Sequence, residues 1–115
     1  MKNMSTQKVM KICEISPEYQ FQGPRFRSLG ETSGEYFREE HLIPWLKSFD
    51  PQTEGIVDFS GTVVYSPSFL EEGFGGAIRQ GYKNQVAKLS FRNIEDKWLT
   101  KLNTFISDAL QLAKK

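Results

Sequence analysis

The feature that most constrains the fold is a short apolar run that ends at a turn and is soon followed by a well-marked helix start. The run covers residues 55–61 (GIVDFSG), and its near-continuous hydrophobicity is typical of a strand buried on both faces. A helix is predicted from Pro67 to about Gln80, because proline suits the first helical position, where its missing amide would be unpaired anyway. A buried strand that leads into a helix favours an α/β layer structure.

The rest of the chain alternates between strand and helix patterns in the same way. Further strands are predicted at residues 8–15 and 86–91, further helices at residues 32–43 and 94–115, and a hairpin or an ordered loop over residues 18–29. This alternation predicts a sheet whose strands are joined by crossover helices.

Local signals place the ends of the predicted helices. Residues 32–35 (TSGE) match a capping box, in which the Thr32 hydroxyl caps the helix and Glu35 reaches back to it. Pro44 has no amide to donate, so it either kinks this helix or starts a fresh turn. Asn93 is the predicted cap of the last helix.

Size and charge limit the class of protein. A chain of 115 residues and 13.2 kDa is expected to form one domain over residues 1–115, and 38% hydrophobic residues with nine Phe can fill one core. Fifteen Lys and Arg face 14 Asp and Glu, a formal charge of +1, so neither nucleic acid nor an anionic membrane is an expected partner.

Cysteine and histidine usage argues against a metal site and against an oxidising compartment. Cys13 is the single cysteine and His41 the single histidine, too few for an internal disulfide or a structural zinc site. The sequence shows no signal-peptide core and no apolar run near the ~20 residues that span a bilayer. We expect a soluble cytoplasmic protein without a cofactor, and no spacing suggests a catalytic constellation.

The start of the helix at Pro67 has two possible caps. Ser66 can cap it, with Tyr65 and Leu70 as a hydrophobic staple, or Ser68 can cap it with Glu71 completing a capping box. In both cases a hydroxyl lies at the positive end of a helix. Glu71 and Glu72 follow in the first turn, where the helix dipole stabilises each negative charge by roughly 0.3–1 kcal/mol.

The same helix carries Gly73, Gly75 and Gly76, which together forgo roughly 3 kcal/mol relative to alanine. Two explanations are open. Gly73 could bring the helix backbone close to the sheet, or Gly75 could leave backbone exposed for a partner to approach. A phosphate-binding loop is not supported, because no Gly-Lys-Ser/Thr sequence follows the glycines.

Two stretches resemble a known family. Residues 23–46 (GPRFRSLGETSGEYFREEHLIPWL) and 57–81 (VDFSGTVVYSPSFLEEGFGGAIRQG) resemble the bacterial STAS-like domain family of unknown function, which is related to anti-sigma-factor antagonists. The most specific matches in the two stretches are Ser33, Gly34, Phe37 and Arg38, and the residues from Ser68 to Gly76.

The resemblance implies a single α/β domain with a four- or five-stranded mixed sheet and packed helices, and a regulatory role without catalysis. In the antagonists, a serine at a strand-to-helix turn is phosphorylated by a GHKL-type ATPase kinase, which switches partner binding off. Ser66, Pro67 and Ser68 fall on that turn here, so Ser68 and Ser66 are the candidate phosphosites. We expect both hydroxyls to act mainly as caps, since a phosphate would add about −1.5 to −2 charge beside Glu71 and Glu72.

We therefore expect a protein–protein interaction module of signalling or transcription regulation, whose partner is a GHKL-type ATPase kinase or another signalling protein. The expected contact residues lie at the turn and on the following helix: Tyr65, Ser66, Ser68, Glu71, Glu72 and Gly75. The alternative is a small-ligand or nucleotide sensor, in which the amides of residues 67–69 and Arg25 or Arg38 contact an anion.

Overall fold

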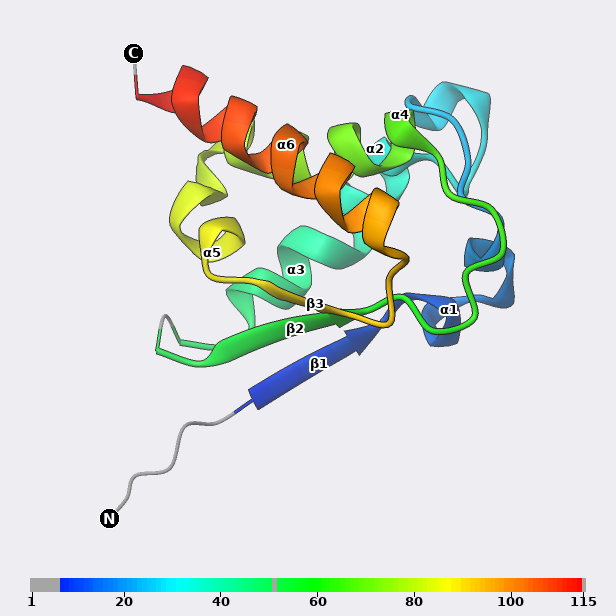
Figure 1. Ribbon diagram of the computed structural model, residues 1–115, viewed down its shortest axis with the longest axis horizontal. Coiled ribbons are helices and arrows are strands. Elements are labelled where there is room, and N and C mark those ends of the chain that lie inside the picture. The colour runs from blue at the N-terminus through cyan, green and yellow to red at the C-terminus, as the bar shows by residue number, and fades with distance from the viewer. Residues whose placement is uncertain (1–6, 51, 115) are drawn as a thin grey trace.

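Three parallel strands and a layer of helices make up the computed structural model, which describes residues 7–50 and 52–114 (Figure 1). The strands are β1 (Gln7–Lys11), β2 (Glu54–Asp58) and β3 (Ser90–Arg92), in the order β1-β2-β3. The prediction of a mixed sheet with four or five strands is wrong for the described residues, since both pairings are parallel and β2 is the one central strand. The prediction of an α/β layer structure is confirmed.

The helical elements follow in chain order. They are α1 (Ile12–Ile15), the 3-10 turns η1 (Pro17–Gln20) and η2 (Arg27–Leu29), α2 (Gly34–Phe37), the π-helix η3 (Arg38–Leu42), α3 (Ile43–Lys47), α4 (Pro67–Leu70), the π-helices η4 (Glu71–Gly75) and η5 (Ile78–Tyr82), α5 (Lys83–Ala87) and α6 (Asp96–Ala113). None of those in the described residues is long and apolar enough to cross a membrane.

The first long helix runs without a break through α2, η3 and α3. Its cap is Ser33, whose hydroxyl accepts from the Tyr36 amide at 3.0 Å, so the predicted capping box is displaced by one residue. Pro44 does not break the helix. The π-turn before it lets the Ile43 amide donate to the Arg38 carbonyl, five residues back, which loosens the helix where proline cannot donate.

Other predicted boundaries shift for local reasons. The first strand ends at Lys11, because Ile12 turns into the core as the start of α1 and is fully buried. Residues 18–29 form an ordered loop with two 3-10 turns, and not a hairpin. The predicted cap Asn93 has a positive φ of 58°, and the first turn of α6 begins after Glu95 without a side-chain cap.

The second long helix extends further than predicted. It kinks at Gly81, whose φ of +104° suits glycine, and continues as α5 to Ala87. The predicted strand at residues 86–91 is therefore wrong in its first half, since Val86 is a buried helical residue and β3 begins at Ser90.

The hydrophobic core lies between the sheet and the helices. Val57 of β2 is fully buried, as the apolar run predicted for a central strand. Aromatic rings fill most of the space above it, and four are at most 1% exposed: Phe37, Phe59, Phe69 and Phe74.

Candidate functional site

The chain that joins β2 to α4 is held by a neighbouring loop. After the turn at Gly61, whose φ is +90°, residues 62–65 run beside residues 20–22. The Val63 amide donates to the Gln20 carbonyl at 2.7 Å, and the Gln22 amide donates to the Val64 carbonyl at 3.0 Å. This pairing fixes the path by which the chain enters the helix.

Large apolar side chains point to solvent on these two paired segments. Phe21 is 54% exposed, Val63 is 63% exposed and Val64 is 48% exposed. Single exposed apolar residues are common on soluble proteins, but adjacent ones mark interaction surfaces more often. We call these three residues the apolar loop.

The structure decides between the two possible caps at the start of α4. The Ser66 hydroxyl accepts from the Phe69 amide at 3.2 Å, and Pro67 takes the first helical position. The Ser66 amide donates to the Gln22 side-chain oxygen at 2.9 Å, which ties the helix start to the apolar loop. The Ser68 hydroxyl has no hydrogen bond among the described residues, so Ser66 is the cap.

We predict that Ser66→Ala lowers the free energy of unfolding by about 1 kcal/mol, the usual cost of losing a serine cap. Ser68→Ala is the matched control and is expected to change it by less than about 0.5 kcal/mol, as surface substitutions usually do. Urea denaturation followed by circular dichroism measures both. Equal losses in the two variants would contradict the assignment of the cap.

Tyr65 is half-buried and is used inside the molecule. Its ring stacks on Trp98 of α6, with centroids 5.4 Å apart and an interplanar angle of 11°. Its hydroxyl accepts from the Glu95 amide at 3.4 Å. Tyr65 therefore connects the helix start to α6.

Glu71 and Glu72 of the second long helix form a partly buried cluster with three arginines. Arg25 contacts Glu71 at 2.6 Å and Glu72 at 3.0 Å, Arg38 contacts Glu72 at 2.6 Å, and Arg79 contacts Glu71 at 2.7 Å. We call these five residues the ion cluster. With three guanidinium groups and two carboxylates, it carries a formal charge of +1.

The arginines hold both carboxylates in their charged form. Hydrogen bonding by Arg79 lowers the pKa of Glu71 against the opposing effect of burial, and Arg25 lowers it further. Burial raises the pKa of Glu72, but the hydrogen bonds from Arg38 and Arg25 outweigh it, so that this pKa is also below its usual value.

The ion cluster changes the interpretation of several predicted site residues. Arg25 and Arg38 do contact anions, but the anions are Glu71 and Glu72 of the same chain. The prediction that Gly75 leaves backbone open to a partner is wrong. Gly75 is buried beneath the Glu71–Arg79 pair, and an added Cβ would lie 2.5 Å from the Glu71 Oε2.

Close packing explains the other helix glycines, but the packing is of helix on helix. A Cβ on Gly73 would lie 3.3 Å from the Phe37 ring, and a Cβ on Gly76 would collide with the Arg38 guanidinium. From the facing helix, a Cβ on Gly34 would lie 2.5 Å from the Phe69 carbonyl oxygen. The glycines therefore bring α2 and η3 close to α4 and η4.

Comparison with known proteins agrees with this arrangement. The family described as the STAS-like domain of unknown function (DUF4325) matches residues 33–97, more than half of the chain. The chain belongs to this family. The matched range begins at the Ser33 cap and includes β2, the helix start at Ser66 and β3, whereas β1 lies outside it. No curated protein and no solved structure matches the chain.

The carboxyl end of the STAS-like sheet holds a polar group that the sequence analysis missed. Asp58 is 4% exposed, and its carboxylate accepts from the Ser60 hydroxyl at 2.6 Å and from the Asn93 side-chain amide at 3.1 Å. Burial raises the pKa of Asp58, but these hydrogen bonds outweigh it and the pKa is lowered. Because Asn93 directly follows β3, its hydrogen bond to Asp58 ties the ends of β2 and β3 together. The lowered pKa makes the carboxylate a weak base. The sequence feature that could have revealed this group is the single charged residue, Asp58, within the apolar run of residues 55–61.

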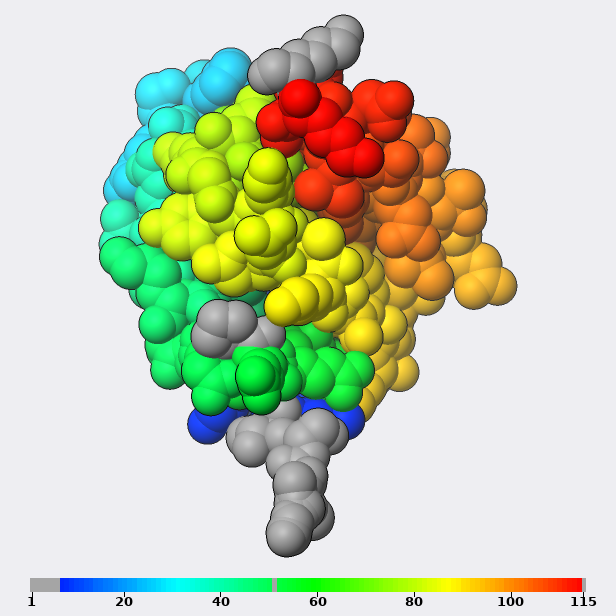
Figure 2. Space-filling view, turned by 90° about the vertical axis from the view of Figure 1, so that its left-hand side faces the viewer, coloured from blue at the N-terminus to red at the C-terminus, as the bar shows by residue number. Residues whose placement is uncertain are grey.

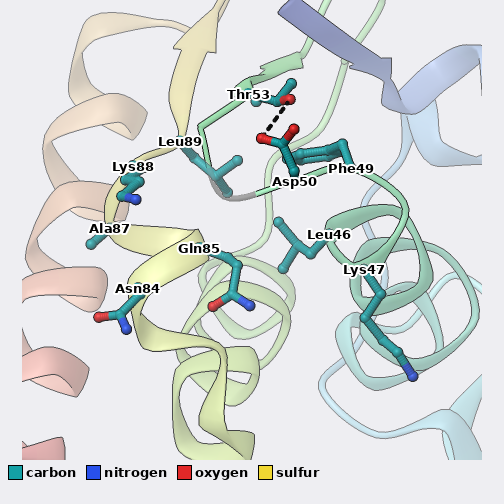
Figure 3. A pocket seen from close by; sticks show the side chains of 11 residues that line it. Leu46, Lys47, Phe49, Asp50, Thr53, Asn84, Gln85, Ala87, Lys88 and Leu89 are labelled. Carbon is teal, nitrogen blue, oxygen red and sulfur yellow. Dashed lines mark hydrogen bonds between the residues drawn. The ribbon is translucent and has the colours of Figure 1, made fainter.

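A cavity of about 710 Å³ lies near the amino ends of β2 and β3, between the ends of α3 and α5 (Figure 3). Figure 2 shows the two segments, green and yellow, beside each other on one face. Leu46, Phe49 and Leu89 supply apolar walls, the Gln85 side chain points into the space and Lys47 points away from it. No sequence pattern marked this cavity. The described residues hold no cluster of three or more potential metal ligands of the His, Cys, Asp and Glu types.

Proposed function

We propose that this STAS-like domain is a non-catalytic regulatory module that binds a protein partner at the entrance to α4. The docking surface consists of the apolar loop (Phe21, Val63 and Val64) and the adjoining residues Ser66 and Ser68. The observation that carries the proposal is the exposure of three adjacent apolar side chains, each 48–63% exposed, on two segments joined by backbone hydrogen bonds. Segments that are already ordered lose less conformational entropy when a partner binds.

The proposed partner is a GHKL-type ATPase kinase or another signalling protein, as the resemblance to anti-sigma-factor antagonists suggests. Of the two candidate phosphosites, Ser68 is favoured because its hydroxyl makes no hydrogen bond among the described residues, whereas Ser66 is occupied as the cap. Repulsion by Glu71 and Glu72 is a weaker objection than the sequence indicated, since three arginines neutralise both carboxylates.

The test is binding of the purified chain to a purified GHKL-type ATPase kinase of the same organism. We expect the double variant Val63→Asp/Val64→Asp to bind at least about tenfold more weakly, as for central apolar contacts in other interfaces. Leu112→Asp is the matched control, because Leu112 is 64% exposed on α6 and lies outside the docking surface. Equal binding by the double variant and the wild type, with the same circular dichroism spectrum, would refute the docking surface.

Phosphorylation needs a separate assay with the same kinase and ATP. Mass spectrometry should find phosphate on the wild type and on Ser66→Ala, and none on Ser68→Ala. Phosphate that persists in Ser68→Ala would reverse the assignment, and its absence from all three proteins would leave binding as the whole function.

A second candidate function, a small-ligand sensor, is favoured by the cavity of about 710 Å³, a volume typical of ligand sites. Arg25 and Arg38 do not support it, because both already pair with carboxylates. A screen of metabolites by thermal shift tests it, since a ligand that binds the folded state raises the melting temperature.

A further inference from the structure

A smaller cavity of about 130 Å³ has a composition unlike the cavity between α3 and α5. It lies where the turn η1 meets residues 31–32 and the helix formed by α2 and η3. Its lining combines aromatic, acidic and hydroxyl side chains: Ile15, Ser16, Glu18, Tyr19, Glu31, Thr32, Tyr36 and His41. The volume is below the roughly 300 Å³ of the smallest usual ligand sites, so the cavity can hold only a small group.

Three aromatic rings form its walls. Tyr19 and His41 meet edge to face, with ring centroids 6.0 Å apart and an angle of 88°. The His41 ring also lies 6.0 Å from the Tyr36 ring. Burial lowers the pKa of His41, so at neutral pH its imidazole is an uncharged wall.

The charged residues that line this cavity are both acidic. The carboxylates of Glu18 and Glu31 form no ion pair or hydrogen bond with any described side chain. Their effect reaches the cavity wall: burial raises the pKa of the Tyr19 phenol, and the carboxylates of Glu18, Glu31 and Glu40 are among the groups that raise it further. The cavity is thus a place of negative potential.

The Tyr19 hydroxyl is a polar group left without a partner. Tyr19 is 2% exposed and lines the cavity, and its hydroxyl has no hydrogen bond to any other residue in the described parts of the chain. Its oxygen is not one of the fully buried unpaired atoms, so solvent reaches it and it can hydrogen-bond to water or to a bound polar group.

One of these rings already contacts a cation. The Arg27 guanidinium lies over the Tyr36 ring, 4.9 Å from its centroid. Its charge is balanced by Glu39 at 2.5 Å and Glu40 at 3.3 Å, so it does not neutralise Glu18 or Glu31.

We propose that this cavity binds an organic ammonium group, with Tyr19, Tyr36 and His41 as aromatic walls and Glu18 and Glu31 as the acidic rim. Aromatic faces attract alkylated ammonium groups, which are hydrated less strongly than a primary ammonium and therefore lose less free energy when they leave water. A metal ion fits less well, since the described residues supply no group of three potential His, Cys, Asp or Glu ligands. The ammonium group belongs either to a free small molecule or to a methylated lysine side chain.

The test compares choline with 3,3-dimethyl-1-butanol, which has the same shape and no charge. Titration followed by NMR should shift the Tyr19, Tyr36 and His41 ring signals saturably with choline, with affinity at least about tenfold above that for the neutral alcohol. A dissociation constant of roughly 20 mM corresponds to a binding free energy of only about −2 kcal/mol. Equal affinities for the two compounds, or no shift with choline up to about that concentration, would overturn the proposal.

Variants separate the acidic rim from general charge effects. Glu18→Gln/Glu31→Gln should weaken choline binding at least about fivefold, and Tyr36→Leu should abolish the ring shifts. Asp108→Asn, an exposed position on α6, removes a negative charge elsewhere and should leave affinity unchanged. An unchanged affinity in the rim variant would also overturn the proposal. N-acetyl-trimethyllysine amide distinguishes the sources, because tighter binding than choline points to a protein side chain and weaker binding to a free ligand.

Discussion

Gly34→Ala is expected to lower the free energy of unfolding by about 2–3 kcal/mol, at the upper end of what overpacking costs. Alanine is the better helix former by about 1 kcal/mol, so helix propensity alone predicts the opposite sign. Packing decides the outcome. The added Cβ would lie 2.5 Å from the Phe69 carbonyl oxygen and 2.9 Å from the Phe69 Cα, and both are backbone atoms that cannot rotate away.

Gly75→Ala is the matched control for this prediction. Gly75 is also a buried helical glycine, but its Cβ would meet the ends of the Glu71 and Arg79 side chains, which can move toward solvent. We expect its free energy of unfolding to change by less than about 1 kcal/mol, since the gain in helix propensity offsets a weakened ion pair. Urea denaturation measures both variants. A Gly34→Ala protein as stable as Gly75→Ala would show that the helices can separate without cost.

These glycines show how far the sequence alone could go. Their cost in a helix was visible from helix propensity, and it correctly indicated a compensating contact. The nature of the contact was not visible, because Gly34 and Gly73 are far apart in the chain and only the fold brings their helices together. The sequence therefore pointed to a close approach but named the sheet as the neighbour where the structure has a second helix.

Elements with one dominant local signal were predicted well. The central strand followed from its apolar run, and the start of α4 followed from Pro67, although the choice between Ser66 and Ser68 as its cap was left open. Errors arose where tertiary contacts override local patterns. Val86 and Ala87 alternate like a strand, but burial of Val86 against the core keeps them in α5.

The candidate site was predicted only in part for the same reason. Ser66 lies where the sequence placed it, at the mouth of a helix. Exposure of the apolar loop depends on the pairing of residues 20–22 with residues 62–65, which no periodicity reveals. Likewise, Glu71 and Glu72 were assigned to a free surface because two of the arginines that pair with them, Arg25 and Arg38, come from other parts of the chain.

Arg38→Met is expected to lower the free energy of unfolding by about 2–3 kcal/mol. The Arg38 side chain is 6% exposed, and it donates to the Glu72 carboxylate at 2.6 Å and to the Glu72 carbonyl at 2.9 Å. Breaking a buried pair by removing one partner typically costs about 3–5 kcal/mol, since the other charge stays buried. The loss should be smaller here, because Arg25 still contacts Glu72 at 3.0 Å and the buried Arg38 Nε, which lacks a partner, disappears.

A double-mutant cycle shows whether the pair itself carries this stability. Arg38→Met/Glu72→Met removes both charges of the pair. Its loss in free energy of unfolding should be smaller than the sum of the two single-variant losses by at least about 1 kcal/mol, a coupling usual for residues in one network. Lys11→Met/Glu14→Gln is the control pair. Its side chains are 51% and 75% exposed and 3.8 Å apart, so a coupling below about 0.5 kcal/mol is expected. Additive losses at Arg38 and Glu72 would mean that Arg38 stabilises the helices by packing over Gly76, and that the carboxylate is held by Arg25 and Arg79 alone.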